Sequence, residues 1–297
     1  MTIVSVALGI TLIALAARDV FDTLFHPHGR GVVSEALARG SWGLMKRVGG
    51  GRPRLRRLAG PVAFSLVVLS WVALVVVGGA LIILPYLPER FAIAAELGAD
   101  EVTGPLGAAY ASFVNLTSLG FGDVVARDDL LRLLGPVQAI IGLAILTASI
   151  SWILSIYRVL GDYRALALET GLLRESERST GRSLMGLPSE SAARIISGLT
   201  SRIIVVRGDF LDFPITYYFC ARDDAGNLPH AISGLISVVE AVRGADSAPA
   251  VALEAERLTL AIEELIATVD DEFLGGRGAS VEETLDRWRR DHPRAAR

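Results

Sequence analysis

Three long, mostly uncharged segments dominate the pattern of hydrophobic and polar positions along this chain of 297 residues. The first covers residues 1–25 and carries charge only toward its end. The second, residues 58–87, and the third, residues 133–157, are uncharged throughout. A helix needs about 20 apolar residues to cross a bilayer. The pattern therefore predicts three membrane-spanning helices.

The charges of the first segment lie where a span can tolerate them. Arg18, Asp19 and Asp22 follow sixteen uncharged residues, Thr2 to Ala17, and Arg18 and Asp22 are spaced to pair at i,i+4. A cleaved signal peptide is the alternative. It is disfavoured because signal peptides place basic residues before the apolar run, whereas here the first basic residue follows it.

Composition supports a membrane protein. The chain is 52% hydrophobic, and its charged fraction of 21% accompanies a mean hydropathy of +0.47, which is too apolar for an ordinary soluble protein. Its single cysteine, Cys220, excludes an intrachain disulfide and a multi-cysteine metal site.

Loop charges predict the orientation, because short cytoplasmic loops carry the excess of Lys and Arg. Residues 26–57 contain eight basic side chains against Glu35 alone, and are predicted to be inside. Residues 88–132 contain seven acidic side chains against three arginines, and are predicted to be outside. We therefore expect a multi-pass plasma-membrane protein with its N-terminus outside and residues 158–297 in the cytoplasm.

The last 140 residues read as charged, amphipathic helices. Apolar residues recur at helical spacing on one face of the clearest helix: Leu258, Ile262, Leu265, Ile266, Val269 and Phe273. Glycine and proline predict helix breaks at five positions: Gly161, Pro188, Pro214, Pro229 and Pro249. The apolar runs 203–206 and 213–220 allow a fourth span, but the intervening charges favour a cytoplasmic core element.

A glycine-containing motif lies between the second and third segments. Residues 117–123 read Thr-Ser-Leu-Gly-Phe-Gly-Asp and follow a stretch, Pro105 to Leu116, that is long enough for a helix crossing half a membrane. Proline at the start of that stretch suits the first turn of a helix. An extracellular turn is the alternative reading of the two glycines. It is disfavoured by the half-length helix, the flanking spans and the predicted outer location.

The motif resembles the selectivity filter of the potassium channels, Thr-Thr-Val-Gly-Tyr-Gly-Asp. The resemblance covers residues 58–157, with Ser118, Leu119 and Phe121 as conservative replacements. It implies an outer helix (58–87), a pore helix (105–116), a filter (117–123) and an inner helix (133–157). It also implies passive potassium conduction through a homotetramer, because each chain carries one filter and the pore requires four.

The resemblance assigns the filter residues their roles. These residues are Thr117, Ser118, Leu119, Gly120, Phe121, Gly122 and Asp123. Backbone carbonyls of Ser118, Leu119, Gly120 and Phe121 bind K⁺, together with the Ser118 hydroxyl. The side chains of Leu119 and Phe121 are expected to pack outward against the pore helix. Glycine at alternate positions suits a backbone that must turn successive carbonyls the same way.

Gly142 lies 22 positions beyond Gly120, where many members of the family carry a hinge in the inner helix. Close helix packing is an equally weighted explanation of this glycine. A helical stripe beyond it is expected to form the cavity and gate: Leu143, Leu146, Thr147, Ile150, Ser151 and Leu154.

Control elements are hard to find in the sequence. No span carries regularly spaced arginines, no phosphate-binding glycine motif follows a strand, and no acidic loop has calcium-binding spacing. His26 and His28 could sense pH or bind metal, although solvated histidines are the commoner case. Anionic lipid headgroups could bind a basic stretch before the second span: Arg52, Arg54, Arg56 and Arg57.

The sequence thus predicts an all-α membrane protein with four parts. These are an N-terminal transmembrane helix (1–25), a basic cytoplasmic loop (26–57), a potassium-channel-like pore domain (58–157) and a helical cytoplasmic domain (158–297). The predicted function is potassium conduction, with K⁺ as permeant ion, no other cofactor, no nucleic acid partner and no enzymatic activity. A weakly selective cation channel, and a membrane-anchored sensor acting through residues 158–297, are the alternatives. The gating stimulus is not predicted.

Overall fold

The protein is an all-α membrane protein, as the sequence predicts. A computed structural model describes residues 2–26, 31–48, 56–94, 102–221, 226–244, 247–276 and 278–293. Within these ranges, three helices are long and apolar enough to cross a membrane. They are α1 (Thr2–Leu24), α4 (Ala59–Ile83) with its short continuation η1 (Leu84–Tyr86), and α7 (Asp129–Thr180).

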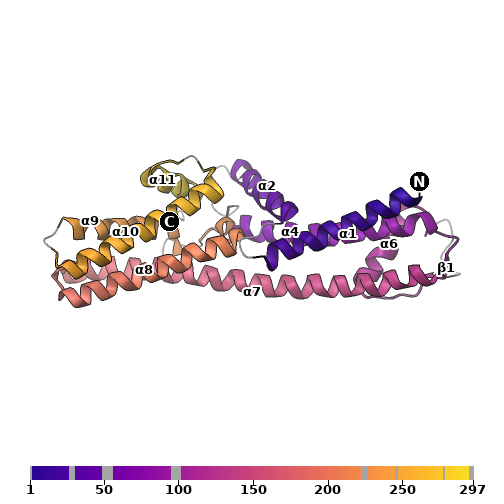
Figure 1. Ribbon diagram of the computed structural model, residues 1–297, viewed down its shortest axis with the longest axis horizontal. Coiled ribbons are helices and arrows are strands. Elements are labelled where there is room, and N and C mark those ends of the chain that lie inside the picture. The colour runs from indigo at the N-terminus through magenta and orange to yellow at the C-terminus, as the bar shows by residue number, and fades with distance from the viewer. Residues whose placement is uncertain are drawn as a thin grey trace. The chain divides into compact units, whose positions relative to one another are not determined.

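The remaining elements are shorter (Figure 1). Those N-terminal to α7 are α2 (Val32–Val48), β1 (Phe91–Ile93), α6 (Pro105–Leu116) and β2 (Val124–Ala126). Those after α7 are η2 (Leu184–Gly186), α8 (Ser189–Asp212), η3 (Pro214–Tyr218), α9 (Leu228–Arg243), α10 (Pro249–Val269), the π-helical turn η5 (Asp270–Leu274) and α11 (Val281–Asp291). The chain forms two compact units, residues 1–40 with 64–154 and residues 41–63 with 155–297.

In the first unit, α1 and α4 approach closely at two glycines. A Cβ at Gly9 would lie 2.4 Å from the carbonyl oxygen of Gly78, and a Cβ at Gly78 would lie 2.7 Å from the carbonyl oxygen of Gly9. The Ser5 hydroxyl donates a hydrogen bond to the Leu81 carbonyl at 2.7 Å. Small residues at a crossing point are the usual means by which membrane helices pack. The first span is thus packed on α4.

The carboxylate of Asp19, within α1, is buried and hydrogen-bonded inside the protein. Asp19 is 2% exposed, and its carboxylate accepts hydrogen bonds from the backbone N–H groups of Val33 (2.8 Å) and Ser34 (3.2 Å). The Ser34 hydroxyl and the Trp71 indole N–H, the latter at 2.8 Å, also donate to it. An acceptor side chain from α1 therefore satisfies free donors at the N-terminus of α2, as a helix cap does.

A two-stranded antiparallel sheet lies beside α6 in the first unit. Phe91, Ala92 and Ile93 of β1 pair with Ala126, Val125 and Val124 of β2, respectively. Phe91 packs in one apolar cluster with Ile83 of α4 and with Ala108 and Ala111 of α6. Two tryptophans pack together between α4 and α7. The ring centroids of Trp71 and Trp152 lie 5.7 Å apart.

The second unit is a helical bundle. α8 and α10 pack along each other, and α9 and α11 pack against α10 (Figure 1). Ile196, Leu199 and Ile203 of α8 are fully buried, as are Leu258 and Leu265 of α10. The apolar stripe predicted for residues 258–269 is therefore the core-facing side of α10. The runs 203–206 and 213–220 lie in α8 and around η3, and neither is among the candidate spans.

Two local expectations are wrong. Gly161 does not break a helix, because α7 runs through it to Thr180. A single glycine in a helix costs only about 1 kcal/mol, and buried neighbours such as Leu160 and Tyr163 hold this part of α7 in place. Residues 26–57 are also more than a loop, because α2 forms within them. Four of the predicted proline positions do lie at element boundaries: Pro188, Pro214, Pro229 and Pro249.

Candidate functional site

The helix before the glycine motif has the residues expected for it. α6 spans Pro105–Leu116, begins with proline in its first turn, and has Gly104 as its N-cap at φ 102°. At the other end, Thr117 closes the helix with its hydroxyl bonded to the Phe113 carbonyl at 2.8 Å. Ser118 and Leu119 donate their N–H groups to the carbonyls of Asn115 and Val114.

The backbone of the motif alternates in handedness. Ser118, Gly120 and Gly122 have φ values of 57°, 58° and 78°. Three left-handed residues at every second position turn the intervening carbonyls in a repeating way, which glycine permits without a Cβ penalty. Ser118 adopts this conformation with a Cβ, at a cost of about 1–2 kcal/mol. Both glycines of the motif thus have the left-handed backbone for which glycine was expected at alternate positions.

Two apolar side chains of the glycine motif do not pack as expected within one chain. Leu119 is 57% exposed and Phe121 is 63% exposed. The prediction that they pack on the pore helix is wrong for the single chain. The reason is that the buried face of α6 is already occupied by α4 and the β1–β2 sheet, which contact Ala108 and Ala111.

The residue that ends the motif is anchored at three atoms. The Tyr110 hydroxyl donates to Asp123 Oδ2 at 2.5 Å, and the backbone N–H of Val124 donates to Oδ1 at 3.0 Å. The Asp123 carbonyl accepts the N–H of Ala94 at 2.9 Å, which continues the β1–β2 pairing. Sequence reasoning missed this sheet. The short apolar runs Phe91–Ile93 and Val124–Ala126 were its only local signal.

A buried polar cluster lies behind the motif and joins three helices. Gln138 of α7, with no exposed surface, donates from Nε2 to the Ser112 hydroxyl at 2.8 Å. Ser112 in turn donates to the Val76 carbonyl of α4 at 2.8 Å, and Asn115 donates to Gln138 Oε1 at 3.3 Å. A Cβ at Gly79 would lie 2.1 Å from Gln138 Nε2, so glycine gives this cluster its space.

The predicted gate residues share one face of α7. Leu143, Leu146, Ile150 and Leu154 are 52–65% exposed, and Thr147 and Ser151 are exposed with them. Between them along the helix, Ile145, Ser149 and Trp152 are buried against the protein. Gly142 faces α6, because a Cβ there would lie 2.0 Å from the Leu116 carbonyl oxygen. The structure therefore gives Gly142 the packing role that the sequence left open.

The predicted basic lipid site is only partly visible. Two of its four arginines, Arg52 and Arg54, lie outside the described residues. The same is true of His28, which was considered above as a pH-sensing or metal-binding residue. Arg56 is engaged within the second unit, where its Nη1 donates to the Arg290 carbonyl at 3.1 Å. Arg57 lines a pocket of the same unit.

Comparison with known proteins bears on the segment that contains this site. Residues 65–158 match the sequence model of a family described as "Ion channel". The chain is also 23% identical over 160 residues to "Uncharacterized membrane protein YdjJ" of Bacillus subtilis (strain 168). That alignment covers 54% of this chain and 46% of the relative, so the chain spans about half of the relative's length. No solved structure matches the chain significantly. Residues 65–158 of this membrane protein therefore carry the sequence pattern of the ion-channel family, which confirms the resemblance expected from the glycine motif.

Proposed function

We propose that this protein is a potassium-selective channel in which four copies of Thr117–Asp123 surround the conduction path. The observation that carries the proposal is the alternation of left-handed residues at Ser118, Gly120 and Gly122, directly after a helix of only 12 residues. A filter needs this backbone because dehydrated cations must be bound by oxygens that point toward one axis.

The ion sites follow from that backbone. Carbonyls of Ser118, Leu119, Gly120 and Phe121 replace the water of a K⁺ ion, and the Ser118 hydroxyl completes the innermost site. The C-terminus of α6 carries a partial negative charge of the helix dipole and precedes the filter directly, so it favours a cation below the filter. Irregular backbone in a membrane is tolerated where it lines such a water-filled path.

Assembly from four copies explains the exposed filter. One chain supplies one side of the path, and a K⁺ channel filter uses four loops. The side chains of Leu119 and Phe121 are exposed in the single chain at 57% and 63%. Neighbouring copies would cover these apolar side chains, which accounts for their presence at the end of a packed helix.

The proposed topology places the filter at the outer face. The basic residues of 26–57 and the acidic residues of 88–132 favour an N-terminus outside and residues 158–297 in the cytoplasm. The gate would then be the exposed stripe of α7 from Leu143 to Leu154, on the cytoplasmic side of the filter.

Reversal potentials of the purified protein in planar bilayers test the function directly. With concentrated K⁺ on one side and dilute K⁺ with Na⁺ as the main cation on the other, we expect a reversal potential close to the K⁺ equilibrium value. A reversal near zero with large currents identifies a weakly selective cation channel instead. If no cation current arises in any preparation that contains tetramers, the channel proposal is wrong and the sensor alternative gains.

A further inference from the structure

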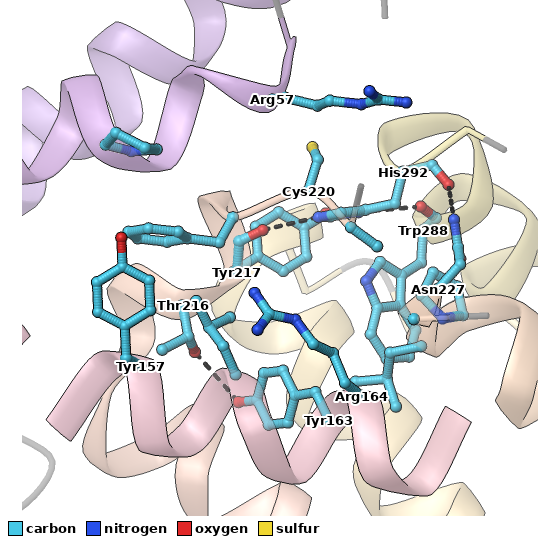
Figure 2. A pocket seen from close by; sticks show the side chains of 17 residues that line it. Arg57, Tyr157, Tyr163, Arg164, Thr216, Tyr217, Cys220, Asn227, Trp288 and His292 are labelled. Atoms are coloured by element: carbon cyan, nitrogen blue, oxygen red, sulfur yellow. Dashed lines mark hydrogen bonds between the residues drawn. The ribbon is translucent and has the colours of Figure 1, made fainter. Parts of the chain in front are cut away.

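The second unit contains a pocket of about 450 Å³ whose function the channel reading does not explain. The lining comes from Arg57 before α4 and Pro61 within it, from α7, from the η3 region, from the start of α9, and from α11 with His292 after it (Figure 2). A volume of this size is typical of small-molecule sites. All lining residues belong to the second unit, so the pocket is a feature of that unit by itself.

The charge of the lining is positive. Arg57 and Arg164 contribute guanidinium groups, and none of the described lining residues is acidic. Figure 2 shows the Arg164 side chain extending into the pocket from α7. His292 adds no charge at neutral pH, because burial lowers the pKa of its imidazole, which lies 2.7 Å from the Tyr217 carbonyl. The described lining therefore favours an anion.

The start of α9 strengthens this preference. Gly226, Asn227 and Leu228 line the pocket where the helix begins, and the Asn227 side chain makes no cap hydrogen bond. The N-terminus of a 16-residue helix carries a partial positive charge. Asn227 is 4% exposed, and its Oδ1 has no partner among the described residues, although its Nδ2 donates to the His292 carbonyl. A buried acceptor in this position is available to a hydroxyl or N–H of a ligand.

Aromatic side chains also line the pocket. Tyr157 and Tyr163 of α7, Tyr217 and Phe219 near η3, and Trp288 of α11 contribute rings. Such rings bury apolar surface and stack on planar groups. The occupant therefore has an organic body as well as an anionic group.

We propose that this pocket binds a phosphate monoester, with Arg57 and Arg164 supplying the positive charge for the phosphate and the organic part against the aromatic side chains. A phosphate monoester carries about −1.5 to −2 charges at neutral pH, which matches two guanidinium groups. Guanidinium groups also bind phosphate oxygens in a bidentate manner. The phosphate can belong to a soluble nucleotide-like molecule or to a phosphatidic acid headgroup, because Arg57 directly precedes the membrane helix α4.

The helix α7 contains both lining residues of the pocket and the proposed gate residues. Tyr157 to Arg164 continue α7 without a break from the stripe that ends at Leu154. An effect of the ligand on ion flow rests on the proposed function. Binding itself does not, so a test of binding and a test of conduction fail independently.

Cys220 supplies a local reporter, because it lines the pocket and is the single cysteine of the chain. Burial raises the pKa of its thiol to about 11, so reaction with a maleimide at about pH 8 is slow enough to follow by mass spectrometry. The full chain, in neutral detergent micelles, is labelled with and without three probes. These are adenosine 5′-monophosphate, dioctanoyl phosphatidic acid and, as a lipid without net charge, dioctanoyl phosphatidylcholine.

We expect at least one phosphate monoester to slow the labelling of Cys220 roughly tenfold at ten times its Kd, because only the empty pocket reacts. Protection by the nucleotide alone or by phosphatidic acid alone assigns the source of the phosphate. The proposal is overturned if neither protects, or if phosphatidylcholine protects as well as phosphatidic acid.

Arginine variants locate the protected site. Arg57→Gln and Arg164→Gln are expected to abolish protection. Arg194→Gln is the matched control, because Arg194 lies on α8 outside the pocket and pairs with Glu190 at 3.0 Å; it should leave protection unchanged. Thermal unfolding of each variant verifies folding. Protection that persists in both pocket variants places the anion elsewhere and overturns the proposal.

Discussion

A Cβ at Gly142 would lie 2.0 Å from the carbonyl oxygen of Leu116, the last residue of α6. The backbone of α7 therefore touches the end of the helix that precedes the glycine motif. A contact this short leaves space for hydrogen alone. The glycine maintains the packing of α7 against α6, through two residues that are 26 positions apart in the chain, and α7 is continuous through it.

Gly142→Ala is therefore expected to destabilise the first unit. Inserting a methyl group into a packed interface typically costs about 1–3 kcal/mol, and a backbone carbonyl cannot move aside as a flexible side chain can. Thermal unfolding of the purified protein in detergent measures the effect as a lower Tm.

Gly161→Ala is the control within the same helix. Nothing lies within 4 Å of a Cβ at Gly161, so alanine should be neutral or stabilise α7 by up to about 1 kcal/mol. If Gly142→Ala leaves Tm unchanged but alters channel opening, the glycine acts as a hinge, and the packing role is wrong.

Asp19→Asn is expected to destabilise the contact of α1 with α2 and α4. The Val33 N–H donates to Oδ1 of Asp19, and the Ser34 hydroxyl and the Trp71 indole N–H donate to Oδ2. The asparagine amide would place donor hydrogens against one of these two sets of donors. Leaving buried donors unsatisfied costs about 1–3 kcal/mol.

Asp22→Asn is the control for Asp19→Asn, because it removes a negative charge from α1 without removing the cap of α2. Asp22 pairs with Arg18 at 3.3 Å, and the Arg18 side chain is 77% exposed, so this pair contributes about 0–1 kcal/mol. Equal losses of thermal stability in the two variants would contradict the capping role of Asp19.

Gly120→Ala is expected to reduce the permeability ratio of K⁺ to Na⁺. The left-handed φ of 58° at this position costs an alanine about 1–2 kcal/mol. Relief of that strain would turn a carbonyl away from the ion path, and 1.4 kcal/mol corresponds to roughly a tenfold change in an equilibrium. Reversal potentials measure the ratio.

Gly181→Ala is the matched substitution outside the proposed filter. Gly181 has φ 65°, and nothing lies within 4 Å of its Cβ position, as at Gly120. It should show similar strain with unchanged selectivity. Loss of selectivity in both variants, or in neither, would argue against a filter at residues 117–123.

Asp209 is expected to make the second unit less stable as pH rises. Burial, with Asp162 nearby, raises the pKa of its carboxyl from 3.8 to about 6. The folded state therefore binds this proton more tightly than the unfolded state, and the free energy of unfolding falls between about pH 4 and pH 6. The full shift corresponds to roughly 3 kcal/mol, which partial solvation reduces to about 1–2 kcal/mol.

Asp209→Asn should raise Tm at pH 7.5 and flatten this dependence, as measured by thermal unfolding across pH 4–8. Asp212→Asn is the control, because Asp212 is exposed and only adds to the negative charge near Asp209. An unchanged pH profile in Asp209→Asn would show that Asp209 titrates normally in the folded protein.

The sequence pattern was sufficient to predict the elements that depend on residues close together in the chain. The three apolar segments contain α1, α4 and the first half of α7 because the bilayer sets the length of an apolar helix. The half-length helix coincides with α6 because proline starts it and the motif follows it. Gly120 and Gly122 are left-handed because glycine alone adopts that conformation freely. The break assigned to Gly161 is wrong because burial of its neighbours outweighs helix propensity.

The sequence by itself determined the membrane spans, the half-length helix and the alternation of the glycine motif, since each depends on residues that are neighbours in the chain. The tertiary structure decided the contact of Gly142 with Leu116, the cap that Asp19 provides for α2, and the sheet that holds Asp123. It also decided the pocket that Arg57 and Arg164 help to line. These features join residues that are distant in the chain, and the folded packing alone determines which atoms meet.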